Sequence, residues 1–308
     1  MIEVIQQCPR QAQYAFLNKR VLGDKQVALN FGGGMHEALR YRYETCPDLV
    51  SSGDEAQQYE ILAKHFCENE LPMVGHRTLE LAQALITGYN RKYQGETFSV
   101  LHINGKPAVE LPFPVFLGEF KVGNDIIKVF YCGKIDLVVK ENDQMFVLDH
   151  KTTSIMGDGF FRELSVSPQM EGYCWALQQT LGITPMGWIA NAIRVPRPEK
   201  RENQKPRKLL YSNNNGIVIV EDDFQRGKTF LREGQLEEWK TNLIALIEEF
   251  FWHHSRGYLP LKRKACVHKY GQCQFFDVCC LPKEHREIML SSGVYVENTW
   301  TPLRKPLV

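Results

Sequence analysis

Two hydrophobic periodicities follow each other along the chain. Between residues 36 and 95, apolar side chains recur three and four positions apart, as in EILAKHF and LELAQALITGY, which is typical of amphipathic helices. Beyond residue 98 the segments AVELPFPVFL, DIIKVFYCGKIDLVVK and QMFVLDHKT are rich in β-branched and aromatic residues, which predicts strands. We therefore expect a helical section over residues 36–95 and an α/β core over residues 98–193.

Turn and capping residues mark the ends of these elements. Residues 141–143, Glu-Asn-Asp, separate the second and third predicted strands, and this short polar break favours a hairpin. A helix is predicted from its N-cap candidate Ser167 to Gly182, the residue type that commonly ends a helix. The run Gly32–Gly34 predicts a break in the chain, with the first helix of the section beginning after it.

The remaining segments complete a mixed architecture. CPRQAQYAF favours a short helix near the N-terminus, GWIANAI favours a strand, and residues 233–256 favour one long amphipathic helix. That helix opens a C-terminal region, residues 233–282, which also carries a cysteine cluster. Helices, a β-meander, a helix and a strand in this order predict a single α/β domain over residues 1–308, with helices covering a sheet.

Composition narrows the class of protein only slightly. The chain has 308 residues, of which 44% are hydrophobic and 24% charged, as in ordinary soluble domains. The net charge of +1 does not indicate a nucleic-acid partner, although a local basic surface is compatible with it. Residues 194–208 hold seven Lys or Arg against two Glu; they either follow a DNA backbone or form a solvated loop.

The cellular compartment is inferred from segments that the sequence lacks. No apolar run reaches the roughly 18 residues of a membrane helix, and the first residues do not form a signal peptide. We therefore expect a cytoplasmic protein without a membrane partner. Nine cysteines are many for that compartment, where structural disulfides are rare, so clustered cysteines favour metal binding.

Two aspartates and a lysine form the first candidate site. Asp149 and Lys151 lie two residues apart on a predicted strand, so their side chains project from the same face. Asp136 lies on the preceding strand, where the hairpin would bring it beside Asp149. Carboxylates on apolar strands are costly to bury unless something binds them, and Mg²⁺ or Mn²⁺ would do so. The simpler interpretation is that the aspartates and the lysine form surface ion pairs.

These residues stand in recognisable motifs. GKIDLVV, FVLDHKTTS and QMEGYCWAL resemble the RecB-like branch of the PD-(D/E)XK nuclease superfamily, in the family's order and over most of the chain. The resemblance implies a restriction-endonuclease-like core, a central mixed sheet flanked by helices, with a helical insertion. It implies catalytic roles for Asp136, Asp149, Lys151, Gln169 and Tyr173. GGGMHEAL and AVELPF add His36 and Glu110, which together with Asp136 and Asp149 are the implied metal ligands.

The late cysteines form the second candidate site. Cys266, Cys273 and Cys279 are spaced by seven and six residues, unlike the usual zinc fingers or ferredoxin runs. RecB-like nucleases that carry iron–sulphur clusters show a similar plan, with one further cysteine near the N-terminus, here Cys8. The resemblance implies a 4Fe-4S cluster that joins the two chain ends. Three alternatives stay open: Cys280 as ligand in place of Cys279, zinc in place of iron, and buried free thiols.

The resemblance also implies a function. It predicts a metal-dependent deoxyribonuclease, similar to CRISPR-associated and phage exonucleases, acting on single-stranded DNA or DNA ends in recombination, repair, phage or CRISPR-related processing. DNA would be the substrate, and a helicase, a recombinase or a CRISPR integration protein the partner class. The alternatives from other classes are a non-catalytic DNA-binding or assembly subunit and a zinc-stabilised nucleic-acid-binding protein.

Overall fold

The computed structural model describes residues 2–23, 27–48, 50–71, 76–196, 208–268 and 271–297. The chain divides into two compact units. We call Gln26–Phe113 with Gly133–Gln235 the sheet unit, and Met1–Lys25, Pro114–Cys132 and Leu236–Val308 the terminal unit. Each unit is built from segments that are far apart in sequence, so the boundary between them crosses the predicted α/β core.

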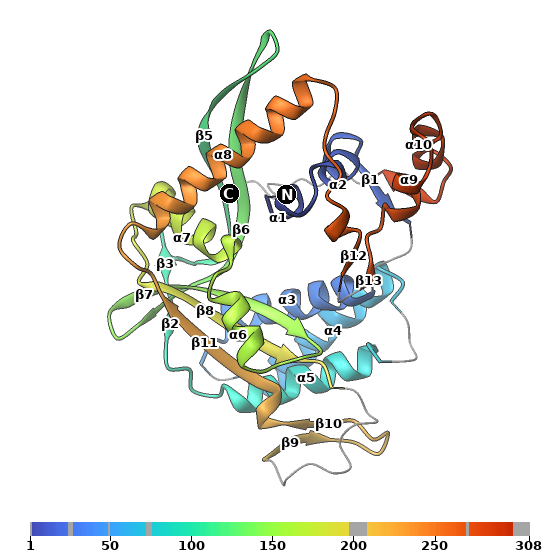
Figure 1. The fold of residues 1–308 in the computed structure, drawn as a ribbon. Coiled ribbons are helices and arrows are strands. Elements are labelled where there is room, and N and C mark those ends of the chain that lie inside the picture. The colour runs from blue at the N-terminus through green and yellow to red at the C-terminus, as the bar shows by residue number, and fades with distance from the viewer. Residues whose placement is uncertain are drawn as a thin grey trace. The chain divides into compact units, whose positions relative to one another are not determined.

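A six-stranded mixed sheet organises the sheet unit (Figure 1). Its strand order is β11-β8-β7-β6-β2, and β5 also pairs with β6. β7 and β8 are parallel, whereas β11 with β8, β6 with β7 and β2 with β6 are antiparallel. The bounds are β2 (Ser99–Val100), β5 (Val109–Val122), β6 (Asp125–Glu141), β7 (Gln144–Thr153), β8 (Gly187–Arg194) and β11 (Phe224–Phe230).

The predicted hairpin joins β6 to β7. Asn142 and Asp143 form its two-residue turn, and both have positive φ angles, +48° and +62°. Asn and Asp tolerate this conformation, and it matches the twist of the flanking strands. The resulting register pairs Leu137 with Leu148 and brings Asp136 to the position beside Asp149, as expected.

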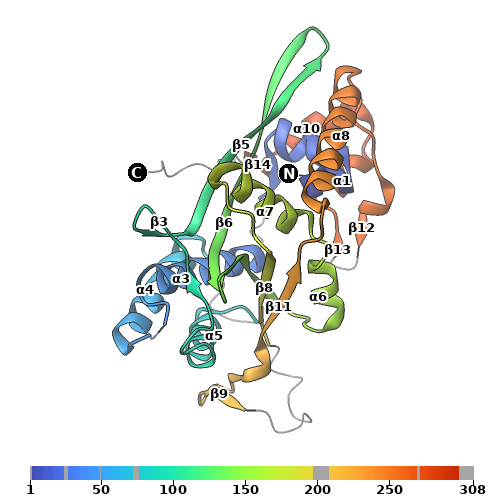
Figure 2. The ribbon, with the colours of Figure 1, turned by 90° about the vertical axis from the view of Figure 1, so that its left-hand side faces the viewer.

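The helical section packs on one face of the sheet. It consists of α3 (Val27–Thr45), α4 (Ser52–Glu68) and α5 (Leu79–Lys92), grouped on the same side in Figure 2. The main core lies between these helices and alternate strand residues such as Leu137, Phe146 and Leu148. Because strand side chains alternate, Asp149 and Lys151 project to the opposite face and His150 projects into the helical side.

One boundary prediction was wrong. The sequence predicted that the first helix of this section begins after Gly32–Gly34, but these glycines lie inside α3. A Cβ atom at Gly34 would lie 3.0 Å from a ring carbon of His65 on α4, and one at Gly32 would lie 3.1 Å from Thr152 Oγ1. The glycines therefore permit close packing of α3, and this packing offsets their roughly 1 kcal/mol cost in a helix.

The opposite face of the sheet is covered by α7 (Pro168–Leu181), which contacts both β7 and β8. Ser167 occupies the N-cap position, but its side chain makes no capping hydrogen bond. Gly182 ends the helix with a φ angle of +66°, as predicted. The smaller elements of this unit are α6 (Asp158–Leu164), β3 (His102–Ile103), β4 (Lys106–Pro107), β9 (Leu209–Ser212), β10 (Val218–Val220) and the 3₁₀ turn Glu221–Asp223.

The terminal unit joins the two ends of the chain. Its bounds are α1 (Ile2–Gln7), α2 (Pro9–Ala12), the π-helical turn Gln13–Leu17, β1 (Arg20–Leu22), α8 (Gln235–Ser255), the 3₁₀ turn Arg263–Ala265, β12 (Val267–His268), β13 (Gly271–Gln272), α9 (Phe276–Cys280), α10 (Lys283–Leu290) and β14 (Tyr295–Glu297). β1 pairs with β14, and the buried Arg10 guanidinium donates to the Leu259 carbonyl at 2.8 and 3.0 Å. Backbone pairing and a buried side-chain contact therefore join segments from the two ends of the chain.

Two expectations concern surfaces. Most of the basic segment 194–208 lies outside the described residues, so its role stays a prediction; Arg194, which is described, pairs with Asp223. Among the described helices, none combines the length and the apolar character that crossing a bilayer requires.

Candidate functional site

Side chains from three elements of the sheet unit converge on one point. His36 lies on α3, Glu110 on β5 and Asp136 on β6, and one ligand atom of each lies within 4.8 Å of the others. His36 Nδ1 is 3.3 Å from Asp136 Oδ2. An imidazole nitrogen and two carboxylates at these separations form a donor set that a divalent cation can bind.

Glu110 reaches this point through an unusual backbone conformation. Its φ angle is +48°, in the left-handed region that residues with a Cβ atom rarely occupy. Such a conformation costs about 1–3 kcal/mol and persists only where the surrounding structure imposes it. The Glu110 carboxylate pairs with Lys134, which precedes Asp136 by two residues on β6 and therefore lies on the same face. Lys134 lies within the motif GKIDLVV, of which only Asp136 was assigned a role from the sequence.

The second part of the site is a line of polar contacts from β7 to α7. Lys151 Nζ lies 2.8 Å from Asp149 Oδ2 and donates to Gln169 Oε1 at 2.9 Å. Gln169 Nε2 in turn donates to the Tyr173 hydroxyl at 2.8 Å. The i, i+4 spacing of Gln169 and Tyr173 places them on one face of α7, so this helix fixes where the ammonium group lies.

The two aspartates have opposite electrostatic environments. Burial raises the pKa of Asp149 to about 6, and the charge of Asp136 adds to this shift while Lys151 opposes it. Burial also disfavours the charged form of Asp136, but the charge and hydrogen bond of His36 outweigh it and hold the Asp136 pKa well below its usual range. Burial lowers the pKa of His36, yet the charge and hydrogen bond of Asp136 prevail and raise it to about 9.

The residues present fit a hard divalent cation. The donor set of one imidazole nitrogen and two carboxylates is the one such a cation prefers. Asp149 Oδ2 is fully buried, and the cation beside it in this structure is the Lys151 ammonium group, 2.8 Å away. The group of three ligand atoms does not include Asp149, whose Oδ2 atom lies 2.8 Å from Lys151 Nζ. His36, Glu110 and Asp136 would hold the cation, and Asp149 would complete the set by exchanging its contact with Lys151.

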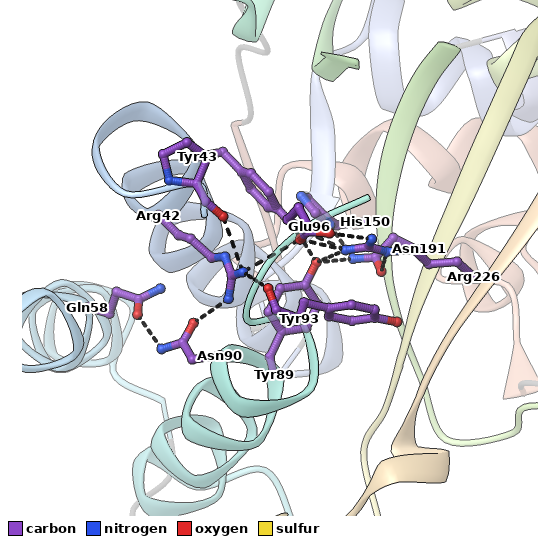
Figure 3. A network of polar contacts seen from close by, with 11 residues as sticks. Arg42, Tyr43, Gln58, Tyr89, Asn90, Tyr93, Glu96, His150, Asn191 and Arg226 are labelled. Atoms are coloured by element: carbon purple, nitrogen blue, oxygen red, sulfur yellow. Dashed lines mark hydrogen bonds and ion pairs between the residues drawn. The ribbon is translucent and has the colours of Figure 1, made fainter. Parts of the chain in front are cut away.

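A buried polar network that the sequence motifs did not reveal lies on the other face of β7 (Figure 3). His150 Nδ1 accepts from Asn191 Nδ2 at 2.6 Å, and Asn191 Oδ1 accepts from Arg226 Nε at 3.1 Å. Arg226 pairs with Glu96 at 2.7 Å. Burial lowers the pKa of His150 to about 3, so its ring is neutral. The available signal was a polar residue inside an apolar strand, Asn191 in GWIANAI.

The four predicted cluster cysteines line one cavity of the terminal unit. Cys8, Cys266, Cys273 and Cys279 share it with apolar side chains, and its volume is about 250 Å³ including the part open to solvent. Burial raises the pKa of Cys273 and raises that of Cys279 to about 11, so both thiols are protonated at neutral pH. Cys280 is exposed and is not among the residues that line the cavity.

Comparison with known proteins gives the family. The model of the PD-(D/E)XK nuclease superfamily matches residues 1–280, and the chain belongs to this superfamily. Its members are usually nucleases that cleave phosphodiester bonds. No curated protein matches the chain. A solved structure described as "Crystal structure of SSO0001" is similar over 71% of this chain and 85% of its own chain. The two sequences are 13% identical, and the TM-score is 0.26.

Proposed function

We propose that this protein is a metal-dependent DNA nuclease whose site consists of His36, Glu110, Asp136, Asp149 and Lys151. The observation that carries the proposal is the convergence of three ligand atoms within 4.8 Å, in a unit that also holds the buried Asp149–Lys151 pair. Because members of the superfamily usually cleave phosphodiester bonds, we expect this protein to cleave the phosphodiester bonds of its substrate.

Each residue has a distinct task in this proposal. A bound Mg²⁺ or Mn²⁺ supplies Lewis-acid stabilisation of a phosphate and lowers the pKa of a coordinated water. Lys151, held by Gln169, places its ammonium group where negative charge develops on the phosphoryl oxygens. Asp136 is kept ionised by His36 and by the backbone N–H of His150, which donates to its Oδ2 at 2.8 Å. A carboxylate that stays ionised at neutral pH suits a metal ligand.

The finer assignment follows the RecB-like resemblance. It specifies exonucleolytic action on single-stranded DNA or DNA ends, in recombination, repair, phage or CRISPR-related processing, with a helicase, a recombinase or an integration protein as partner. The test compares end-labelled linear DNA with circular DNA, in Mg²⁺, Mn²⁺ and EDTA. We expect metal-dependent degradation of the linear substrate alone.

A matched pair of lysine variants assigns the cleavage to this site. Lys151→Met should reduce degradation about 100-fold or more, whereas Lys140→Met should retain it, because Lys140 lies on the same hairpin but pairs with Asp143. Equal activity of the two variants would show that Lys151 does not take part in cleavage. DNA binding by the wild-type protein without cleavage in any metal would favour a non-catalytic subunit.

We also propose that Cys8, Cys266, Cys273 and Cys279 bind a 4Fe-4S cluster. The support is that four thiols from both ends of the chain line one cavity. Four thiolates are the usual ligand set of such a cluster. Iron and sulphide analysis after anaerobic purification tests the proposal, and stoichiometric zinc without iron would reject it.

A further inference from the structure

His150 contacts each of three elements that carry candidate metal ligands. It follows Asp149 directly on β7, and its backbone N–H donates to Asp136 Oδ2 on β6 at 2.8 Å. Its ring meets the ring of His36 edge to face, with centroids 5.8 Å apart. A displacement of His150 would therefore move the ligands of α3, β6 and β7 relative to one another.

The ring of His150 is held from several sides. It stacks on Tyr43 of α3 at a centroid distance of 5.7 Å and an interplanar angle of 20°, and it meets Tyr89 of α5 edge to face at 6.4 Å. Tyr43 lies seven residues after His36, two turns along the same face of α3. The stack on Tyr43 therefore also orients the helix that carries His36.

The orientation of Asn191 determines which hydrogen bond reaches His150. Arg226 can only donate, so the contact with its Nε atom requires Asn191 to present its carbonyl oxygen there. The Asn191 amide nitrogen is then directed to His150 Nδ1 and to the Tyr89 hydroxyl, 2.9 Å away. His150 must accept through Nδ1, and this fixes both its tautomer and its ring plane.

Arg226 is itself held rigidly. Its Nη1 and Nη2 atoms lie 2.7 and 2.9 Å from the two oxygens of Glu96, and its guanidinium stacks on Tyr93 at 3.6 Å from the ring centroid. Tyr43 also donates to Glu96 at 2.7 Å. Burying charged groups is costly unless they are paired, and the two-point pairing of Arg226 with Glu96 restricts where the guanidinium can lie. The position of Arg226 in turn fixes Asn191, and Asn191 fixes the ring of His150 on β7, the strand that carries Asp149.

We propose that His150 is a positioning residue, held by Asn191, Arg226 and Glu96, which sets the mutual placement of His36, Asp136 and Asp149 for metal binding. This inference rests on the proposed nuclease function. Asp136 and Asp149 project from the other face of their strands, whereas His36 comes from α3, on the side of the network. Among the contacts of the described residues given above, His150 joins the network to these ligands. Outer-shell partners of this kind typically change metal affinity or activity 10- to 100-fold when removed.

Two asparagine variants provide a matched test. Asn191→Leu removes the contacts to His150 and Arg226. Asn90→Leu removes a second buried amide whose oxygen accepts from a buried arginine, Arg42, at 2.9 Å, on the arm of Figure 3 that leads to Gln58 and away from His150. Both should lower the melting temperature. Only Asn191→Leu should weaken Mn²⁺ binding at least tenfold, followed by the electron paramagnetic resonance signal of free Mn²⁺.

The kinetic readout separates positioning from general destabilisation. Asn191→Leu should lower kcat with little change in KM for DNA, and higher Mn²⁺ concentrations should restore part of the loss. Equal Mn²⁺ affinities of the Asn191 and Asn90 variants would overturn the inference. If Asn191→Leu does not fold, His150→Phe is the second variant. It keeps an aromatic ring for the stack and the backbone N–H, but it lacks Nδ1. Unchanged Mn²⁺ affinity in His150→Phe would also overturn the inference. A wild-type protein that neither binds Mn²⁺ nor cleaves DNA would instead reject the proposed function.

Discussion

Lys151 Nζ donates a 2.9 Å hydrogen bond to Gln169 Oε1, and this bond ties β7 to the helix that covers it. Removing Gln169 would leave the ammonium group charged and paired with Asp149 but without its link to α7, whereas removing Lys151 would delete the charge itself. We therefore expect Lys151→Met to reduce cleavage by about 100-fold or more and Gln169→Ala to have a smaller effect. Single-turnover cleavage rates measure both. A loss in Gln169→Ala equal to that in Lys151→Met would mean that the amide has a direct role.

The nitrogen ligand should determine which metals support cleavage. Mn²⁺ accepts imidazole more readily than Mg²⁺, so Mn²⁺ should support cleavage at least as well. Ca²⁺, with looser geometry, should permit DNA binding but little hydrolysis. His36→Ala should remove most of the Mn²⁺ advantage. Metal titrations of the cleavage rate test this, with His285→Ala as control because His285 is exposed on α10. Wild-type rates in both metals for His36→Ala would exclude the histidine as a ligand.

Protons and metal should compete in the site. The pKa of His36 is raised from 6.5 to about 9, so its stabilising contribution is complete below pH 6.5 and is lost as the pH rises through 9. Burial raises the pKa of Asp149 from 3.8 to about 6, so ionisation of this carboxyl destabilises the folded state increasingly as the pH rises from 3.8 through 6. In EDTA the free energy of unfolding should therefore fall between pH 6.5 and 9.

The measurement is urea denaturation at a series of pH values, with and without Mn²⁺. His36→Gln should flatten the decline above pH 6.5, while the exposed-site variant His285→Gln should retain it. Mn²⁺ should stabilise the wild-type protein more at pH 8 than at pH 6, because binding displaces the protons. A metal effect independent of pH would contradict this linkage.

Adjacent cysteines give a matched test of the cluster. Cys279 lines the cavity with Cys8, whereas Cys280 is exposed. Cys279→Ser should lose visible absorbance and iron and should unfold at a lower temperature, because the link between the chain ends is weakened. Cys280→Ser should match the wild type in all three measurements. The reverse result would identify Cys280 as the ligand, and no iron in any of the proteins would reject the cluster.

The local pattern of the sequence determined the elements. Period-two alternation in QMFVLDHKT placed Asp149 and Lys151 on one face, and the turn residues Asn142 and Asp143 determined the hairpin that brings Asp136 alongside. These features follow from the sequence because they depend on neighbouring residues: side-chain direction in a strand and tolerance of positive φ are local properties.

Contacts between distant residues were decided only in the tertiary structure. Glycines that would interrupt an isolated helix lie inside α3 because His65 packs against Gly34. Glu110 reaches the site through a left-handed backbone that no motif indicates. Asn191 meets His150 across 41 residues of sequence and Tyr89 across 102. Such pairings have no period along the chain: burial selects them, since a polar group removed from water requires a partner wherever the fold supplies one.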